Sequence, residues 1–575
     1  MAHLESSYKG KPKPVRSKVP EPQRVSASRF GMIATAHWCA TDAGREILED
    51  GGNAVDAAVA AALALGVCEP AASGIGGQTM MLVHTAEPRR TLALDGSSRA
   101  PNRAAPEATK DSESRRRGHA ATTVPSTLAT LDYALRKYGT MKFSRVMEPA
   151  IRLAEEGYIV SSLQKRLAKR ELKSLRESSA AQFFLDDGVR PYRAGRLFKQ
   201  PVLAQTLRRL AEEGVTEFYQ GEIARQMDAD MQENGGLLRL DDLAQIPWPI
   251  ERRPVSCHFA HHRVITFPPP GAGRTLVEML QILSNFPSRL WNVDTPEGAL
   301  VLVEVIRRAF LDRRDRPYDP TFYAQVDDRR MMSDEYAKRV ANRIRRRVRP
   351  HGETFHVEEA RRERARREGT EAGASREKEN GKSGHEDAMR GETTHLSVMD
   401  RFGNAVALTQ SIERVFGSFS ASPELGFLYN NYMMAFEHED IAHPYHLRPN
   451  AVPWASVAPT LVFRGRRPWV AIGSPGSELI TPSILQVLLR LELQSPYDAV
   501  SAPRIHCDIE KTVSLEVARM RDDIPAFLEE RGFSINPCEP FSFFLGCVQL
   551  VMYENKTFVG VADPRRDGSA GGPSR

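Results

Sequence analysis

Two adjacent threonines, Thr393 and Thr394, stand where the chain changes character. Upstream of them, Glu358–Ala388 contains no aromatic residue and no aliphatic residue larger than alanine. Such a composition cannot bury enough apolar surface to offset the entropy lost on ordering, so this strip should stay loose and solvated. Downstream, His395–Asp400 and Ala405–Ile412 alternate as strands do on either side of a glycine-containing turn, which predicts a β-hairpin.

This arrangement suits a precursor that cuts itself. A threonine hydroxyl is a poor nucleophile at neutral pH unless a base lies beside it, and an N-terminal amine is one such base. Cleavage before Thr393 would create that amine, whose reference pKa of about 7.7–8.0 leaves a useful fraction unprotonated near neutrality. The alternative is that Thr393 and Thr394 only start a strand behind a surface loop, because threonine favours strands.

Sequence motifs favour the catalytic interpretation. From Thr393 the chain reads T-T-H-L-S-V-x-D-x-x-G-N-A-V-A-x-T, then F-G, then G-x-L-x-N-N. This stretch resembles the start of the small subunit of γ-glutamyltranspeptidases, which are N-terminal-nucleophile hydrolases. Further motifs match in chain order: Gly51–Ala58, Gly74–Gly77, Lys137–Met141, Pro268–Pro270, Gly473–Gly476 and Ala562–Arg565. The resemblance extends over roughly residues 28–570.

The distribution of strands in hairpins with helices before and after them suits an α+β fold. The resemblance implies its specific form, a four-layer αββα sandwich in which two antiparallel sheets pack between helices. It also divides the chain into a disordered N-terminal tail (1–27), a large-subunit region (28–350), a charged flexible linker ending at the self-cleavage site (351–392) and a small-subunit region (393–575). The two subunits of the precursor are expected to remain associated.

The resemblance assigns chemistry to particular residues. Thr393 is the nucleophile, and its bond to Glu392 is the one that must break. Ser411 stands where the family has a hydroxyl, usually of threonine, that hydrogen-bonds the amine of the nucleophile. The backbone N–H groups of Gly476 and Ser477 form the oxyanion hole, with Ser477 replacing the family's usual glycine. Losing one such donor costs about 3–4 kcal/mol of transition-state stabilisation.

Substrate recognition is where the sequence departs from the family. The arginine that holds the α-carboxylate of a γ-glutamyl group falls at Ser97, with Arg99 two residues further along. The aspartate that binds the α-ammonium falls at Ala435. A zwitterionic head without these partners loses charge-assisted hydrogen bonds that contribute about 1.5–3 kcal/mol each. The substrate-binding residues expected in this chain are Arg99, Glu413, Tyr432 and Ser456.

Three functions remain open on the sequence. The first is a self-processing γ-glutamyltransferase or glutathione hydrolase. The second is an amidohydrolase or acylase of the same mechanism that takes a glutaryl- or oxamate-like acyl donor. The third, remote from these, is a non-catalytic basic binding protein. The first two share a small-molecule amide substrate and require neither a cofactor nor a metal.

Composition limits the kinds of partner that this protein is expected to bind. The 575 residues are 41% hydrophobic and 26% charged, with a net charge of +6. These values are typical of an ordinary soluble protein. The basic runs lack interleaved aromatic residues, so no nucleic-acid partner is expected. The six cysteines have no CxxC spacing, which predicts neither a zinc site nor a disulfide framework. With no apolar leader or membrane-length apolar run, we expect a cytoplasmic protein without a membrane partner.

Several elements should position these residues. Folding is expected to begin near Phe30, and Asn53 should cap a helix over Ala54–Val67 that is buried on most sides. Residues 123–250 are predicted to be mostly helical, and His438–Pro449 to form a loop over the pocket. Other predicted helices are Asp42–Glu49, Leu276–Leu283, Ala299–Asp315 and Ile480–Leu491. Predicted strands are Met80–Thr85, Thr91–Leu94, Val264–Phe267, Gly426–Asn431, Val462–Phe463, Trp469–Ile472, Val513–Val517, Val548–Tyr553 and Phe558–Asp563.

Overall fold

The hairpin that begins at the Thr-Thr pair lies at the centre of a seven-stranded sheet. In the computed structural model, which describes residues 19–109, 111–315, 331–348 and 391–574, β12 (Gly391–Asp400) pairs antiparallel with β13 (Ala405–Arg414). The sheet order is β21-β2-β12-β13-β3-β4-β9. The remaining strands are β21 (Ser569–Gly571), β2 (Gly31–Thr35), β3 (Gln78–Thr85), β4 (Arg90–Gly96) and β9 (Ile250–Arg252). The predicted hairpin is confirmed.

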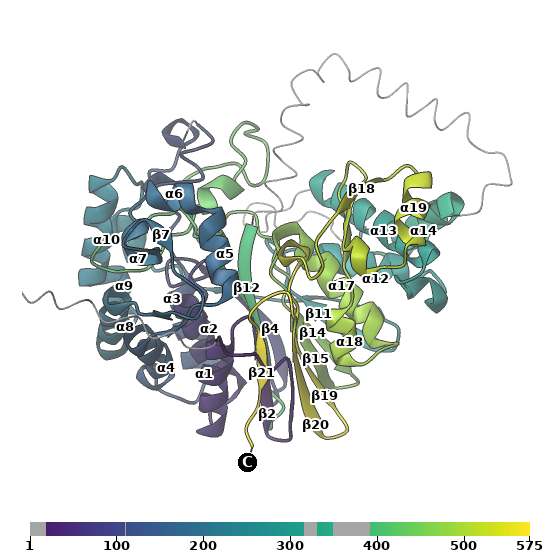
Figure 1. Cartoon of the computed structure of the whole chain (residues 1–575), viewed down its shortest axis with the longest axis horizontal. Coiled ribbons are helices and arrows are strands. Elements are labelled where there is room, and N and C mark those ends of the chain that lie inside the picture. Colours follow the sequence, from purple (N-terminus) through teal and green to yellow (C-terminus); the bar gives the residue numbers. More distant parts are fainter. Residues whose placement is uncertain (1–18, 110, 316–330, 349–390, 575) are drawn as a thin grey trace, which may run out of the picture.

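A second seven-stranded sheet faces the first (Figure 1). Its order is β1-β20-β19-β15-β14-β11-β10, and all its pairings are antiparallel. Its strands are β1 (Val25–Ser28), β20 (Thr557–Ala562), β19 (Gln549–Glu554), β15 (Arg467–Gly473), β14 (Thr460–Arg464), β11 (His262–Thr266) and β10 (Val255–Phe259). Smaller sheets comprise β16 (Ile505–Cys507), β17 (Thr512–Leu515) and β18 (Ser534–Pro537); β5 (Tyr158–Ile159) and β8 (Leu197–Phe198); and β6 (Leu185–Asp186) and β7 (Arg190–Pro191).

Helices cover the outer side of each large sheet (Figure 1). Those beside the first sheet are α1 (Trp38–Glu49), α2 (Ala54–Cys68), α3 (Thr127–Tyr138), α4 (Phe143–Glu156), α5 (Ser162–Arg170), α6 (Leu172–Arg176), α7 (Ala181–Phe184), α8 (Pro201–Glu213), α9 (Thr216–Gln220), α10 (Glu222–Glu233) and α11 (Leu240–Ala244). Those beside the second are α12 (Gly273–Leu283), α13 (Pro296–Asp315), α14 (Asp334–Val348), α17 (Ile480–Leu491), α18 (Pro496–Ser501) and α19 (Asp523–Glu530). The molecule is therefore a mixed α+β structure built on two antiparallel sheets.

The two-residue period of the strands divides the core. In β2, Ile33 packs with the helices of the first layer, whereas Met32 and Ala34 pack with the second sheet. Successive side chains of a strand point to opposite faces, so a strand buried on both faces is apolar at every position. This explains why β2 is fully buried along its whole length.

Helix α2 supports the nucleophile strand from behind. Asn53 caps it as predicted: its side-chain oxygen accepts hydrogen bonds from the N–H groups of Val55 (2.8 Å) and Asp56 (3.1 Å). Alanines along the helix let it pack against β12 and β13. The Asp56 carboxylate also binds the N–H and hydroxyl of Thr140 at 2.8 and 2.6 Å, which gives the Lys137–Met141 motif a structural role.

Two predicted starting points differ from what is observed. The ordered fold begins before Phe30, because β1 starts at Val25 and pairs with β20. Helix α1 starts at Trp38, four residues before the predicted start, since the Nδ1 of His37 accepts the N–H of Cys39 and so caps the helix. The predicted linker lies outside the described residues, apart from its last two.

The prediction of a strand over Gly426–Asn431 is wrong. Only an isolated bridge, Ala421 to Leu428, forms there. Gly426 has a φ of +72°, far from the extended values of a regular strand, and the side chain of Asn430 binds the carbonyl oxygens of Gly76 (2.8 Å) and Thr123 (3.0 Å). Loop-to-loop hydrogen bonds thus replace a strand ladder.

Candidate active site

The β12–β13 pairing distinguishes the two threonines. Glu392 pairs with Glu413 and Thr394 with Gln410, so the register shifts by one residue at Thr393 and forms a bulge. Thr393 lines a cavity and is 6% exposed. The hydroxyl of Thr394 is fully buried and has no hydrogen-bond partner among the described residues. The bulge therefore presents one hydroxyl, that of Thr393, to the cavity.

The carbonyl group that precedes Thr393 is held by the opposite strand. The hydroxyl of Ser411 donates to the carbonyl oxygen of Glu392 at 2.6 Å, and in turn accepts the N–H of Glu413 at 2.8 Å. A donor on a carbonyl oxygen withdraws electron density from its carbon and favours nucleophilic attack there. In the uncut chain Ser411 thus contacts the bond expected to break rather than a free amine.

One buried guanidinium contacts both residues of that bond. Arg566 binds the Glu392 carboxylate at 2.5 Å and the Thr393 carbonyl oxygen at 2.8 Å. It also binds Glu69, at the C-terminal end of α2, at 3.2 Å. The N–H of Thr393 donates to the same Glu392 carboxylate at 3.0 Å. Arg566 was not among the residues predicted from the sequence, although it directly follows the Ala562–Arg565 motif.

This cluster has an unusual charge state. Burial raises the pKa of the Glu392 carboxyl to about 7, the Arg566 cation lowers it and the Glu69 carboxylate raises it again. Two buried carboxyl groups, those of Glu392 and Glu69, share one arginine, so the cation stabilises the charge of each less than it would in a simple pair. The environment of Glu392, the residue before Thr393, therefore disfavours the ionised form of its carboxyl group.

The expected oxyanion loop lies beside the cavity. Gly476 has a φ of +122° and Ser477 a φ of +52°, so the backbone turns sharply between β15 and α17. In the part of the chain that the structure describes, neither of their N–H groups donates to a backbone or side-chain acceptor. A positive φ at serine is strained by roughly 1 kcal/mol. Ser477 nevertheless adopts this left-handed conformation, which is natural to glycine.

Close packing fixes this loop in place. The hydroxyl of Ser474 accepts the N–H of Cys547 at 2.9 Å. A Cβ on Gly473 would lie 2.2 Å from the ring of His395, so only glycine fits there. That ring is held by Thr409 (2.8 Å) and Ser397 (3.1 Å), and burial lowers the pKa of His395 to about 3. A neutral imidazole therefore links the nucleophile strand to the strand that leads into the oxyanion loop.

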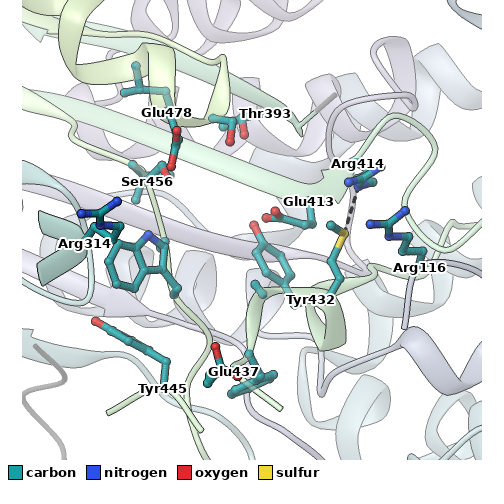
Figure 2. Close-up of a pocket in the computed structure, with 18 of the residues that line it drawn as sticks. Arg116, Arg314, Thr393, Glu413, Arg414, Tyr432, Glu437, Tyr445, Ser456 and Glu478 are labelled. Carbon is teal, nitrogen blue, oxygen red and sulfur yellow. Dashed lines mark hydrogen bonds between the residues drawn. The ribbon is translucent and has the colours of Figure 1, made fainter. Parts of the chain in front are cut away.

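The cavity in front of Thr393 measures about 480 Å³. Figure 2 shows Thr393, Glu413 and Tyr432 around it, with Arg116 and Arg414 on one side and Arg314 on the other. Of the predicted substrate-binding residues, Glu413, Tyr432 and Ser456 line this cavity, as does Ser477. The predicted loop His438–Pro449 contributes His443 and Tyr445 to the lining.

Glu413 is the central acid of the cavity. Its φ of +80° turns the side chain out of the β13 ladder, and its carboxyl group forms no hydrogen bond to another described side chain. Burial raises the pKa of Glu413 to about 7, and the neighbouring Arg414 lowers it. Tyr432 lies close enough that the Glu413 charge helps to raise the pKa of its phenol, with burial as the larger cause. The carboxyl group of Glu413 and the hydroxyl of Tyr432 thus offer hydrogen-bonding groups to a ligand in the cavity.

The predicted substrate-binding region has no pair of charged side chains at Ser97, Arg99 and Ala435 that could hold a γ-glutamyl head group. Ser97 is buried, and its hydroxyl donates to Asp95 at 2.5 Å. Arg99 does not line the cavity, and its guanidinium binds the side chain of Asn450 at 3.3 Å. Ala435 does line the cavity and presents a methyl group there. Three arginines line the cavity, namely Arg116, Arg314 and Arg414. Arg414 adjoins the predicted Glu413, whereas Arg116 and Arg314 come from distant segments that carry no local sequence signal for the site.

The glycine motif Gly74–Gly77 serves packing. A Cβ on Gly76 would lie 2.2 Å from the Leu428 carbonyl oxygen, and one on Gly77 would lie 2.2 Å from that of Ser411. The loop therefore presses against the strand residue that contacts the Glu392 carbonyl. Among the described residues, no three histidine, cysteine or acidic side chains gather as a metal would require. No described helix has both the length and the apolarity needed to cross a membrane.

Comparisons with known proteins agree with this site. The family model "Gamma-glutamyltranspeptidase" matches residues 40–572. The glutathione hydrolase proenzyme of Escherichia coli (strain K12) is 33% identical over 94% of this chain and 91% of its own length. The Acylase ACY 1 proenzyme of Pseudomonas sp. (strain SE83) is 31% identical over 84% of each chain.

The fold has a close counterpart among solved structures. The crystal structure of cephalosporin acylase from Bacillus halodurans superposes over 100% of both chains, with a TM-score of 0.81 and 26% identity. Relatives on both the glutathione hydrolase side and the acylase side are therefore similar along nearly the whole chain. On the match of its sequence from residue 40 to residue 572, the chain is an enzyme of the γ-glutamyltranspeptidase family.

Proposed function

We propose that this chain is a proenzyme that cuts itself between Glu392 and Thr393, and that the mature enzyme hydrolyses or transfers the acyl group of an amide through an ester on Thr393. One observation carries the proposal: the Thr393 hydroxyl faces the cavity while the Ser411 hydroxyl holds the preceding carbonyl at 2.6 Å. The nucleophile and the activated carbonyl carbon thus belong to one strand bulge.

Self-cleavage then follows in two steps. The Thr393 oxygen attacks the Glu392 carbonyl carbon, its proton passes to the departing Thr393 nitrogen, and the C–N bond breaks to leave an ester. Water adds to that ester, which releases Glu392 with a terminal carboxylate and regenerates the Thr393 hydroxyl. Arg566 supports both steps because it binds the groups on either side of the bond.

In the mature enzyme the new amine of Thr393 acts as the base for its own hydroxyl. The hydroxyl attacks the substrate amide, and the N–H groups of Gly476 and Ser477 stabilise the oxyanion. The leaving amine departs, and water or a second amine takes the acyl group from the ester.

The architecture supports two associated chains. We assign the two sheets and their helical layers to the four-layer αββα sandwich of N-terminal-nucleophile hydrolases, with residues 28–350 in the large subunit and 393–575 in the small one. In the first sheet, β12 and β13 of the small subunit lie between β2 and β3 of the large one. A third pairing in this sheet, β21 with β2, and two in the second sheet, β1 with β20 and β11 with β14, also join the two regions. Separation would break all five strand pairings, so the cut chains should stay together.

The acyl donor is the second part of the proposal. Ala435 carries no charge, and the side chains of Ser97 and Arg99 already bind Asp95 and Asn450. At these three positions, the cavity therefore lacks the charged groups that would bind the zwitterionic head of a γ-glutamyl group. We therefore propose an acylase-like amidohydrolase acting on a donor such as a glutaryl or oxamate amide, with γ-glutamyl transfer or glutathione hydrolysis as the alternative. The similarity to an acylase proenzyme and to a cephalosporin acylase structure supports this order.

Two measurements test the proposal. The intact mass of the purified protein, with N-terminal sequencing of the smaller chain, should give a chain that begins at Thr393. Values of kcat/KM for matched γ-glutamyl, glutaryl and oxamate anilides should then rank the donors. A small chain that begins elsewhere would refute the nucleophile, whereas a clear γ-glutamyl preference would refute only the donor.

A further inference from the structure

A second cavity, of about 430 Å³, opens between the two sheets away from Thr393. Its base contains His84, Ile265 and Phe463, and the rings of His84 and Phe463 meet edge to face at 5.0 Å. The Nδ1 of His84 and the hydroxyl of Thr91 are 2.8 Å apart, so the polar group at the base is already paired. We call this cavity the arginine groove, after the residues on its rim.

Five arginines line the groove: Arg89, Arg90, Arg253, Arg263 and Arg466. No acidic residue is among the residues that line it. All five are exposed, and they come from three separate places, the β3–β4 turn, the segment between β9 and β10 with strand β11, and the β14–β15 turn. The fold thus gathers cations that are far apart in the sequence.

Four of these arginines have no ion-pair partner among the described residues. Arg90 binds Glu251 at 2.8 Å. The guanidinium groups of the other four, Arg89, Arg253, Arg263 and Arg466, form no ion pair or hydrogen bond within the described ranges. The contrast within one turn is informative, because Arg464 pairs with Glu554 at 2.6 Å and Arg467 stacks on Tyr553 at 4.3 Å, whereas Arg466 does neither.

The concentration of unpaired charge favours an anionic ligand. Like charges that converge on a concave surface repel one another and produce a strong local positive potential. A guanidinium binds phosphate or carboxylate through two parallel hydrogen bonds. A volume of this size is in the range that accommodates a small molecule rather than one atomic ion.

We propose that the arginine groove binds a small polyvalent oxyanion, one that carries several phosphate or carboxylate groups. The site is separate from catalysis. Along β13, Ser411 near the nucleophile pairs with Gln78, and Ala405 pairs with His84 of the groove. Six residues of strand place the two sites about 20 Å apart.

Binding can be tested on the full-length, self-processed protein by titration calorimetry at low ionic strength. The probes are inorganic tripolyphosphate and citrate, which distinguish phosphate from carboxylate chemistry. The test variant is Arg263→Ala with Arg466→Ala. The control variant is Arg29→Ala with Arg193→Ala, which removes the same charge from two exposed arginines outside the groove.

The wild-type protein should bind at least one probe saturably, with one site per chain. The groove variant should bind about tenfold or more weakly, while the control variant keeps wild-type affinity. Absence of saturable binding by both probes, or equal loss in both variants, would overturn the proposal. A short DNA duplex that binds the groove while neither probe does would also overturn it. Amide hydrolysis at Thr393 should be unchanged in both variants, so this result does not depend on the proposed catalysis.

Discussion

The floor and the wall of the Thr393 cavity are built by different means. The floor presents Thr393 and Ser477 to the cavity, and Ser411 and Gly476 support them without lining it. Strand register, hydrogen bonds of 2.6–2.9 Å and the close packing of Gly473 against the ring of His395 hold these residues in place. The wall consists of Glu413, Tyr432, Ala435 and loop residues from 436 to 457. The loop contributes side chains to the cavity without a strand ladder of its own.

This difference separates the reaction from its selectivity. On the proposed mechanism, backbone donors and one hydroxyl carry out the chemistry, whatever the acyl group carries at its far end. The wall residues, most of them in loops, would select the ligand, and exchanging them would leave the floor intact. A single fold can therefore serve glutathione hydrolases and acylases alike.

The largest effect is expected at the floor. Thr393→Ala should leave the chain uncut and lower amide hydrolysis by about a thousandfold or more, because one hydroxyl performs both steps. Thr393→Ser should retain part of each activity. Intact mass and anilide turnover measure the two outcomes.

The neighbouring threonine gives a matched control. Thr394→Ala removes a buried hydroxyl without a partner among the described residues, so both cleavage and turnover should persist. An uncut Thr393→Ala protein that still hydrolyses amides, or a Thr394→Ala protein that fails to cut, would contradict the assignment of the nucleophile.

A smaller effect should separate maturation from turnover. Arg566→Ala leaves the Glu392 and Glu69 carboxylates buried without their cation, a change that typically costs about 3–5 kcal/mol. Self-cleavage, followed by gel densitometry over time, should slow by about a hundredfold or more. Arg566→Lys, which keeps the charge, should recover part of the rate.

Stability must be separated from chemistry in that experiment. The thermal midpoint of Arg566→Ala, measured in the uncuttable Thr393→Ala background, reports the structural cost alone. If cleavage of Arg566→Ala keeps the wild-type rate, the guanidinium has no part in positioning the bond.

The wall should show a pH signature of its own. The pKa of Glu413 is raised to about 7, so the folded protein holds a proton that the unfolded chain releases near pH 4.5. Glu413 therefore contributes stability at low pH that is lost as the pH rises from about 4.5 through 7. Glu413→Gln, measured by urea unfolding in the Thr393→Ala background, should gain about 3 kcal/mol relative to its parent at pH 8 but not at pH 4.5. An equal difference at both pH values would show that the Glu413 pKa is not raised.

The smallest expected change concerns donor choice. Ala435→Asp places a carboxylate in the wall where an α-ammonium group would bind, and one charge-assisted hydrogen bond is equivalent to about tenfold in kcat/KM. The ratio of γ-glutamyl to glutaryl anilide turnover should rise by about that factor. Ala435→Asn, of the same size without the charge, is the control. A ratio unchanged by the aspartate would mean that the acyl head binds elsewhere in the cavity.

Local patterns predicted the elements of the floor. Alternation revealed the hairpin, Asn53 marked the start of α2, and the Gly473–Gly476 motif marked the turn between β15 and α17, since each signal lies within a few residues of what it specifies. The wall and the Arg566 cluster could not be found this way. Glu69, Glu392 and Arg566 are distant in the sequence, and Gly426–Asn431 has the composition of a strand although its hydrogen bonds go to loops.

The separation of Arg566 from Thr393, 173 residues along the chain, bears on the order of events during synthesis. The backbone carbonyl of Arg566 accepts a hydrogen bond from Arg24 at 2.7 Å, and the following strand β21 pairs with β2, so early and late segments of the described chain meet near the Glu392–Thr393 bond. During synthesis, Thr393 leaves the ribosome long before Arg566 does. A partly made chain that ends before Arg566 lacks the cation that holds Glu392. On the proposed mechanism, such a chain should be cut as slowly as the Arg566→Ala variant, so self-cleavage would follow the arrival of Arg566 in the fold.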